Sequence, residues 1–337
     1  MSMATKKALI TGITGQDGSY LAELLLKKKY EVSGIVRKTS HEDYANIGHI
    51  QDNLKLYQGD LLDPVSLREI IQKIGPDEVY NLASQSHPSE SFKQPIHTAE
   101  ITGIGAHRVL DATLDVNPKT KFYQASSSEM FGWVREIPQT EETPFNPANP
   151  YAAAKLYAFA MTKIYRKSYN MFATNGILFN HESPRRHLGF VTQKVTYAAA
   201  CARLGINNSD HLNEEGELVV KNGKVSLGNL EAKRDWGYAG DFVEAMWLMM
   251  QADTADDFVV ATGETHSIQE LCEEAFGYVN LNWKDHVIVD KRFIRPTETG
   301  PLVGNPAKAK KILGWEPKTK FKELVKIMVD AHLARLK

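Results

Sequence analysis

Two residues that could share acid–base chemistry, Tyr151 and Lys155, stand four positions apart directly after Pro150. Proline suits the first turn of a helix, and residues spaced i and i+4 on a helix lie on one face. An ammonium group near a phenol favours the phenolate and lowers the pKa of the tyrosine, which makes it a usable base near neutral pH. The alternative is an ordinary surface pair on an amphipathic helix, which is the better interpretation of such a pair in isolation.

A second group of reactive side chains precedes this pair. Residues 126–129, Ser-Ser-Ser-Glu, follow a strand-like run at 121–125 and lead into a proline-rich loop. In open parallel sheets, ligands bind outside the carboxyl ends of the strands. The hydroxyl groups and the carboxylate of this segment are therefore placed where a substrate could meet Tyr151.

Three glycines could hold a phosphate near the N-terminus. Gly12, Gly15 and Gly18 follow the apolar run 8–10 and precede a helix-like stretch at 20–26. In such a strand–turn–helix unit, the glycines permit a tight turn, the approach of a pyrophosphate and close packing of helix on strand. The helix N-terminus adds unpaired N–H groups and partial positive charge. A tight turn with no ligand is the alternative.

The elements that must position these residues alternate between strand and helix. Further strands are expected at 31–36, 54–60 and 78–82, with helices at 64–74 and 96–114. This alternation predicts right-handed βαβ units and a parallel sheet, that is, an α/β fold of the Rossmann-type, doubly wound class. Asp63 and Pro64 are typical of the start of the helix at 64–74.

Residues at the ends of the predicted strands indicate the cofactor. Arg37 follows the second strand, where an arginine accommodates a 2′-phosphate and favours NADP over NAD; a solvated basic turn is the alternative. Asp60, after the third strand, could lie near an adenine or cap the next turn. The small and polar residues at 82–87 could run past a ribose or a nicotinamide.

Bulk properties exclude several classes of function. The chain has 337 residues and a formal net charge of −1, so there is no overall field to attract nucleic acid or an anionic membrane. Its two cysteines, Cys201 and Cys272, are far apart and fit a reducing compartment rather than a disulfide framework. No stretch has the length and hydrophobicity of a membrane span. We therefore expect a cytoplasmic protein.

The second half of the chain is less regular. A strand is expected at 175–180 and a helix at 190–204, while the polar stretch 206–223 reads as an exposed excursion. The helix at 241–251, rich in Met and Trp, is expected to pack in the core, and residues 324–336 form an amphipathic helix. A metal site at His181 and Glu182 is rejected, because no second histidine stands at ligand spacing. Scattered arginines at 234, 292 and 295 suit a compact polyanion such as a diphosphate.

Longer motifs carry a resemblance to known proteins. The GxxGxxG glycines, Ser-Ser-Ser-Glu and Tyr-x-x-x-Lys resemble the extended short-chain dehydrogenases/reductases. Residues 10–21, 122–126, 176–186 (Gly-Ile-Leu-Phe-Asn-His-Glu-Ser-Pro-Arg-Arg) and 234–236 resemble the GDP-mannose 4,6-dehydratase family over nearly the whole chain. A close relative of that family acts on GDP-manno-heptose. The resemblance implies an NADP-dependent hydro-lyase that forms a 4-keto-6-deoxy sugar.

The resemblance also assigns roles to residues. The catalytic residues would be Ser127 (where the family has threonine), Glu129, Tyr151 and Lys155. With the turn residues above, the predicted cofactor-binding set is Gly12, Thr14, Gly15, Gln16, Asp17, Gly18, Arg37, Asp60, Leu61, Leu82, Ala83, Ser84, Ser86, Tyr151, Lys155, His181 and Arg186. The predicted GDP-sugar-binding set is Ser86, Glu90, Ser127, Glu129, Asn180, Lys194, Arg234, Arg295 and Glu298.

The family implies the organisation of the chain as well. An NADP-binding domain would comprise residues 1–180 and about 238–265, and a smaller mixed α/β domain, residues 181–237 and 266–337, would bind the GDP-sugar. The segment after Arg37 would reach a neighbouring subunit of a homotetramer, with a dimer as the alternative. Pro88 and Glu90 replace apolar residues of similar family members, and His97 replaces a tyrosine, so the sugar stays open between mannose and manno-heptose.

The implied reaction is an internal redox dehydration. Tyr151, helped by Lys155, would take the proton from the sugar O4 as hydride leaves C4, Glu129 would take the C5 proton, and water would leave from C6. A nucleotide-sugar 4-epimerase or reductase of the same fold is the alternative enzyme. A non-catalytic NADP-binding regulator is a third reading, which the four intact reactive side chains disfavour.

Overall fold

A seven-stranded parallel sheet forms the centre of the computed structural model, which describes residues 5–38, 44–213, 215–294 and 300–337. Its strands are β1 (Lys7–Thr11), β2 (Glu31–Val36), β3 (Leu54–Gln58), β4 (Glu78–Asn81), β5 (Lys121–Ser127), β6 (Ala173–Leu178) and β12 (Asp257–Val260). Their order in the sheet is β3-β2-β1-β4-β5-β6-β12. This is the doubly wound order, which reverses direction between β1 and β4 and places a ligand crevice at that point.

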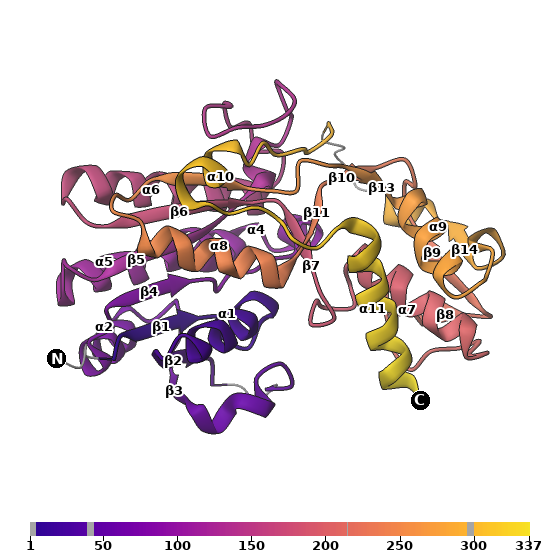
Figure 1. Cartoon of the computed structure of the whole chain (residues 1–337), viewed down its shortest axis with the longest axis horizontal. Coiled ribbons are helices and arrows are strands. Elements are labelled where there is room, and N and C mark those ends of the chain that lie inside the picture. Colours follow the sequence, from indigo (N-terminus) through magenta and orange to yellow (C-terminus); the bar gives the residue numbers. More distant parts are fainter. Residues whose placement is uncertain (1–4, 39–43, 214, 295–299) are drawn as a thin grey trace.

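Helices cover both faces of the sheet (Figure 1). α1 (Gln16–Lys27) and α8 (Ala239–Gln251) pack together over one face, where Met246 and Met249 are fully buried beside Leu21. The other face is covered by α2 (Pro64–Ile74), α5 (Gly105–Val116) and α6 (Pro150–Ser168). The predicted core role of the 241–251 helix is therefore confirmed.

The helix predicted at 64–74 has the bounds and the cap that its sequence indicated. The Asp63 carboxylate accepts hydrogen bonds from the backbone N–H groups of Val65 and Ser66, at 3.0 and 3.2 Å. Pro64 occupies the first turn, where no N–H is needed, and Gly75 ends the helix with a φ of 57°.

The single helix expected at 96–114 is in fact broken. The structure has α3 (Pro88–Lys93), α4 (Pro95–Thr98), a π-helical turn (Ala99–Ile104) and then α5. Two glycines account for the irregular part, because a Cβ on Gly103 would lie 3.3 Å from the carbonyl oxygen of Ala154 and one on Gly105 would lie 2.9 Å from Leu61 Cβ. The backbone at these two glycines therefore lies close to α6 and to the loop after β3, and the helix is irregular where it makes these contacts.

A second hydrophobic core lies beyond the sheet. It is built from α7 (Val191–Arg203), α9 (Ile268–Tyr278) and α11 (Phe321–Leu336), which lie on the right in Figure 1. Ser267 and Glu270 form a reciprocal capping box at the start of α9. The remaining short elements are β7 (Asn180–Glu182), β8 (Val220–Lys221), β9 (Lys224–Leu227), β10 (Lys233–Arg234), β11 (Trp236–Tyr238), β13 (His266–Ser267), β14 (Val287–Val289) and α10 (Ala307–Leu313).

The stretch 206–223 is only partly the exposed excursion that its polarity indicated. Val219 and Val220 are 3% and 2% exposed and belong to the second core, and Leu212 pairs with Leu218 in a short bridge. The prediction was wrong for this end of the stretch, because Val220 begins β8, which pairs with β9, and the adjacent Val219 is buried with it.

The last strand of the sheet arrives late in the chain. β12 pairs with β6 after the chain has passed through α7 and the short strands β7 to β11, and Asp257 fixes it. Asn175 Nδ2 donates to Asp257 Oδ1 over 2.8 Å, and Arg166 pairs with the other carboxylate oxygen at 2.9 Å. The chain thus returns to the sheet through α8 and β12, and the exact division into two domains stays a prediction. In the described residues, no helix combines the length and hydrophobicity that a membrane crossing requires.

Candidate active site

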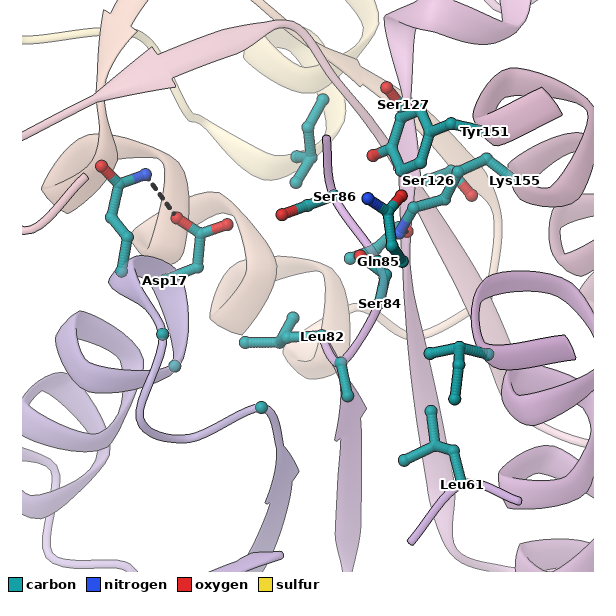
Figure 2. A pocket seen from close by; sticks show the side chains of 18 of the residues that line it. Asp17, Leu61, Leu82, Ser84, Gln85, Ser86, Ser126, Ser127, Tyr151 and Lys155 are labelled. Atoms are coloured by element: carbon teal, nitrogen blue, oxygen red, sulfur yellow. Dashed lines mark hydrogen bonds between the residues drawn. The ribbon is translucent and has the colours of Figure 1, made fainter. Parts of the chain in front are cut away.

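A cavity of about 450 Å³ opens where the carboxyl ends of β1, β2, β4 and β5 meet. Figure 2 shows its wall, with Leu82, Ser84 and Ser86 on one chain segment and Tyr151, Lys155 and Ser127 across from them. Every residue predicted to bind the cofactor lines this cavity: Gly12, Thr14, Gly15, Gln16, Asp17, Gly18, Arg37, Asp60, Leu61, Leu82, Ala83, Ser84, Ser86, Tyr151, Lys155, His181 and Arg186. Their roles toward a cofactor stay predictions.

The glycine turn at the cavity floor has no room for side chains. Gly12 has a φ of +72°, and a Cβ there would lie 2.9 Å from the backbone nitrogen of Ala83. A Cβ on Gly18 would lie 2.2 Å from the carbonyl oxygen of Gly12. The glycines therefore let β1, α1 and the segment after β4 approach one another, as the sequence predicted.

The N-terminus of α1 points its backbone toward the same cavity. Gly15 occupies the N-cap position, and within the described residues no side chain caps this helix. The asparagine Asn46 steadies the turn by donating its amide to the carbonyl oxygen of Thr14 over 3.0 Å. Uncapped N–H groups at a helix start, joined to a glycine turn, have the features that bind a diphosphate.

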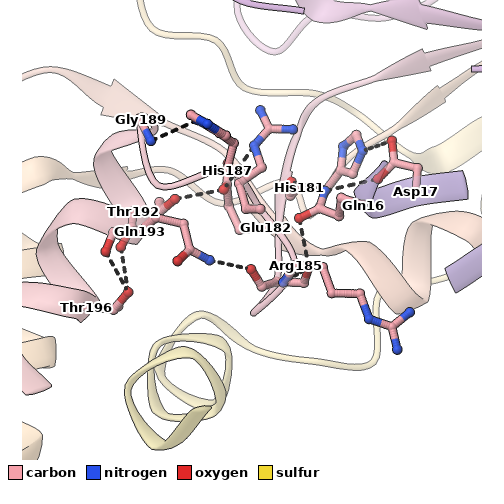
Figure 3. A network of polar contacts seen from close by, with 12 residues as sticks. Gln16, Asp17, His181, Glu182, Arg185, His187, Gly189, Thr192, Gln193 and Thr196 are labelled. Atoms are coloured by element: carbon pink, nitrogen blue, oxygen red, sulfur yellow. Dashed lines mark hydrogen bonds and ion pairs between the residues drawn. The ribbon is translucent and has the colours of Figure 1, made fainter. Parts of the chain in front are cut away.

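A buried ion pair flanks the helix start. His181 Nε2 lies 2.8 Å from Asp17 Oδ2 (Figure 3). Its Nδ1 lies 2.7 Å from the Phe179 carbonyl oxygen, and its ring stacks on Phe242. Burial raises the pKa of Asp17, but the charge and hydrogen bond of His181, with Gln16 and Arg186, outweigh it and lower that pKa to about 2. Burial lowers the pKa of His181, yet Asp17 outweighs it and raises that pKa above 6.5. Both imidazole nitrogens are thus engaged by protein atoms.

The predicted catalytic residues converge at one end of the cavity. Tyr151 and Lys155 come from α6 and are 8% and 4% exposed. Ser127 Oγ, at the end of β5, accepts from the backbone N–H of Glu129 at 3.2 Å. The carboxylate of Glu129 is held by Asn149, whose Nδ2 donates to Glu129 Oε2 over 3.0 Å.

Asn149 was not among the predicted site residues, although it joins two parts of the site. Its Oδ1 accepts from the Ala152 N–H at 2.8 Å and so caps the helix that carries Tyr151. The same amide orients Glu129, so one side chain sets the position of Glu129 relative to Tyr151. The sequence signal was present, since Asn before Pro150 is a helix-cap pattern.

The pKa shift expected for Tyr151 is not found. Burial raises the pKa of Tyr151 to about 12, even though the Ser127 hydroxyl and the charge of Arg186 act to lower it. Burial also lowers the pKa of Lys155 to about 8, and its Nζ donates to the Ala125 carbonyl oxygen at 2.7 Å rather than to the phenol. The Lys155 Nζ lies 5.8 Å from the centre of the Tyr151 ring. Desolvation therefore outweighs the pairing inferred from i,i+4 spacing.

Residues predicted at the sugar end are more dispersed. Asn180, Ser86, Ser127 and Glu129 line the cavity, whereas Glu90, Lys194 and Arg234 are not part of its described wall. Glu90 lies on α3, where it accepts a hydrogen bond from Gln94. Lys194 is buried on α7, with its Nζ 5.0 Å from the centre of the Phe293 ring, and Arg234 lies on β10. Arg295 and Glu298 lie outside the described residues.

An aromatic group at the start of α7 also escaped the sequence prediction. Phe190 lines the cavity. The centre of its ring lies 4.3 Å from the centre of the His87 ring and 3.7 Å from the guanidinium carbon of Arg186. A lone phenylalanine in a Gly-Phe-Val sequence gives no signal of this role. Its position depends on how the second core meets the sheet.

Solved structures with the same fold identify the class. A UDP-glucose 4-epimerase from Thermotoga maritima superimposes with a TM-score of 0.85 at 22% identity, covering 98% of this chain and 100% of that one. A dTDP-glucose 4,6-dehydratase from Bacillus anthracis has a TM-score of 0.80 at 21% identity, covering 97% and 96%. With the doubly wound sheet and the glycine turn, these likenesses show a Rossmann-type fold.

Sequence comparison defines the family within this class. Residues 9–328 match the family model of GDP-mannose 4,6 dehydratase. GDP-mannose 4,6 dehydratase 1 of Arabidopsis thaliana is 50% identical, covering 97% of this chain and 90% of the relative. The Homo sapiens GDP-mannose 4,6 dehydratase is 48% identical, covering 97% of this chain and 91% of the relative. The chain belongs to the GDP-mannose 4,6-dehydratase family.

Proposed function

We propose that this chain is an NADP-dependent GDP-sugar 4,6-dehydratase, which converts GDP-mannose or GDP-D-glycero-D-manno-heptose to the GDP-4-keto-6-deoxy sugar. The observation that carries the proposal is the grouping of Glu129, Ser127 and Tyr151 at one end of a cavity whose other end is a glycine turn and a helix N-terminus. Relatives that are 43–50% identical over nearly the whole chain carry the name of this activity.

The residues divide the proton transfers among themselves. Tyr151 takes the proton from the sugar O4, and the Ser127 hydroxyl steadies the oxygen that develops charge. A bound nicotinamide would supply the redox chemistry, accepting the hydride from C4 and returning it to C6. Lys155, whose Nζ donates to the Ala125 carbonyl oxygen, is the cation nearest to this chemistry on α6, with its Nζ 5.8 Å from the centre of the Tyr151 ring.

Glu129 is the residue that favours dehydration over epimerisation. A 4-ketone acidifies the C5 proton, and a carboxylate held by Asn149 is placed to remove it as water leaves C6. A 4-epimerase has no use for a base at C5. The alternative function, a nucleotide-sugar 4-epimerase or reductase, rests on the shared fold, which the solved epimerase structures also have.

The choice of NADP rests on Arg37. This arginine follows β2 and lines the cavity, where a guanidinium can pair with a 2′-phosphate. A nicotinamide cofactor is also named in neighbouring structures, one with NADPH and one with NAD. Arg37→Gln should weaken NADP binding about tenfold or more and leave NAD binding within about twofold; equal losses for both dinucleotides would argue against the 2′-phosphate contact.

Product analysis tests the function directly. The protein is incubated with GDP-mannose and with GDP-manno-heptose side by side, and kcat/KM and product mass are measured for each. Loss of one water supports dehydration, and the larger kcat/KM identifies the sugar. An unchanged mass with altered stereochemistry would show an epimerase, and a gain of two hydrogens from added NADPH would show a reductase.

The proposed assembly is a homotetramer. The support is the family and the position of Arg37 at the start of the segment that would reach a neighbouring subunit, although residues 39–43 lie outside the described part of the chain. Light scattering after gel filtration, with and without NADP, measures the assembly. A dimer under both conditions would show that the proposed tetramer is wrong and would leave only the site within one subunit as proposed.

A further inference from the structure

A buried line of hydrogen bonds connects the C-terminal helix to the glycine turn. His332 on α11 lies with its Nε2 2.7 Å from Gln193 Oε1 on α7. Gln193 Nε2 donates to the Ser183 carbonyl oxygen over 2.6 Å, and Ser183 Oγ donates to Gln16 Oε1 over 2.8 Å. Gln16 is the first residue of α1, so the line ends at the cavity (Figure 3).

The polarity of this line follows from its chemistry. The Ser183 carbonyl oxygen can only accept a hydrogen bond, so the Nε2 of Gln193 faces it and the Oε1 of Gln193 faces His332. Because Oε1 can only accept, the Nε2 of His332 must carry a hydrogen. Burial lowers the pKa of His332 to about 4, with Arg335 and His211 acting in the same direction. The imidazole is therefore neutral near pH 7. All of these side chains are at least nine-tenths buried.

Both N–H groups of the Gln16 side-chain amide are used, and its oxygen accepts one hydrogen bond. Its Oε1 accepts from Ser183, and its Nε2 donates both to Asp17 Oδ1 at 3.0 Å and to the His181 carbonyl oxygen at 3.1 Å. Its amide thus holds Asp17 and the strand β7 in one arrangement. A shift of Ser183 would change all of these bonds at the start of α1.

Gln193 therefore has an unexpected position. It belongs to a helix of the second core, and its neighbour Lys194 is predicted to bind the GDP-sugar, yet its side chain supports the segment that holds the glycine turn. We propose that Gln193 is a positioning residue for dinucleotide binding, acting on the turn through Ser183 and Gln16. This inference rests on the proposed function, because it requires that the cavity bind a nicotinamide dinucleotide.

The test is to measure ligand affinities of the full-length protein by calorimetry. Gln193→Met keeps the volume and removes both hydrogen bonds. The dissociation constant of NADP should rise about fivefold, as expected for a weakened buried hydrogen-bond network. The dissociation constant of GDP should change less than twofold. If Gln193 only held α7 in its core, GDP binding would weaken as much as NADP binding or more, and that result would overturn the inference.

Two further variants keep the test decisive. Thr196→Val is the matched control, because Thr196 is fully buried on the same helix and its hydroxyl donates within the helix, to Thr192 and Gln193 carbonyl oxygens at 2.8 and 3.3 Å. It should leave the NADP affinity within twofold. Ser183→Ala breaks the line one step nearer the turn and replaces Gln193→Met if that variant does not fold.

The double variant separates the explanations. If Gln193 acts through Ser183, Gln193→Met combined with Ser183→Ala should weaken NADP binding no more than Ser183→Ala alone. Additive losses would overturn the inference. If the unmodified protein binds neither NADP nor NAD, the proposed function fails, and the inference fails with it. If the parent chain binds NADP and Gln193→Met binds it equally well, the inference about Gln193 is overturned while the proposed function stands.

Discussion

The two ends of the cavity are built in different ways. The end predicted to bind the dinucleotide consists of backbone turns that directly follow strands, and glycines such as Gly12 and Gly18 fix it by steric necessity. The end predicted to bind the sugar depends on single side chains from separate elements. Ser127 on β5 and Asn180 on β7 line the cavity, whereas Lys194 on α7 and Arg234 on β10 lie outside its described wall. A site made of backbone is encoded locally, whereas a site made of scattered side chains depends on how the two cores meet.

The largest expected effect lies at the chemical centre between these ends. Glu129→Gln keeps the shape and the Asn149 contact but cannot accept a proton from C5. We expect kcat to fall by about 10²–10⁴-fold, with the affinities for NADP and GDP-sugar within about threefold. Steady-state rates and calorimetry provide the measurements. Near-normal turnover would place the C5 base elsewhere and would remove the distinction from an epimerase.

The backbone-built end should tolerate no added atom. In Gly18→Ala the new methyl would lie 2.2 Å from the Gly12 carbonyl oxygen and 2.6 Å from Ile13 Cα, so α1 must move away from β1. We expect about 3 kcal/mol less stability to urea and at least tenfold weaker NADP binding.

Gly277→Ala is the matched control for this substitution, because Gly277 lies in α9 with no atom within 4 Å of its added Cβ. That variant should be unchanged or more stable by up to about 1 kcal/mol. If Gly18→Ala behaved like the control, the steric account of the dinucleotide end would be wrong.

Substitutions at the end predicted to bind the sugar should change substrate binding rather than the stability of the fold. Lys194→Met removes a buried ammonium that is predicted to meet the substrate, and a lost charge-assisted contact corresponds to about a tenfold rise in KM for the GDP-sugar. The NADP affinity and kcat should stay within about twofold. Arg203→Met, at the other end of α7, tests whether any lost cation on the helix has the same effect. An unchanged KM in Lys194→Met would move the sugar site away from α7.

The smallest effect is a pH dependence of stability from the pair beside the turn. The raised pKa of His181 means that its contribution is fully present below pH 6.5 and is lost as pH rises through its folded pKa. The Asp17 carboxylate, lowered from 3.8 to about 2, contributes above pH 3.8 and loses its effect as pH falls through about 2. From pH 5.5 to 8.5, Tm should fall about 2 °C further in the parent chain than in His181→Gln. Parallel Tm profiles would show that the pair does not stabilise the cofactor-binding end.

The sequence supported the fold to the extent that its signals were local. Asp63 and Pro64 predicted the start of α2, and Gly12, Gly15 and Gly18 predicted the turn. The burial of Val219 and Val220 was not foreseen, because two valines in a polar stretch become core only against α7 and β9.

The site was predictable by residue type but not by electrostatics. The positions of Tyr151 and Lys155 followed from their spacing, yet the raised pKa of the phenol depends on burial by distant segments. The support of Glu129 by Asn149 spans a twenty-residue loop and could not be read from either motif alone. The same holds for Gln193, whose partners Ser183 and His332 are separated by much of the chain.

The late position of β12 has a consequence during synthesis on the ribosome. Until residue 257 has emerged, β6 has a partner strand only on the β5 side, and its other edge, which is fully buried in the folded protein, stays open. At about 5–20 residues per second, the roughly 80 residues between the end of β6 and β12 leave it unpaired for about 4–16 seconds. An unpaired edge of this kind invites pairing with other chains, so the interval before β12 emerges is when the nascent chain most needs protection by a chaperone.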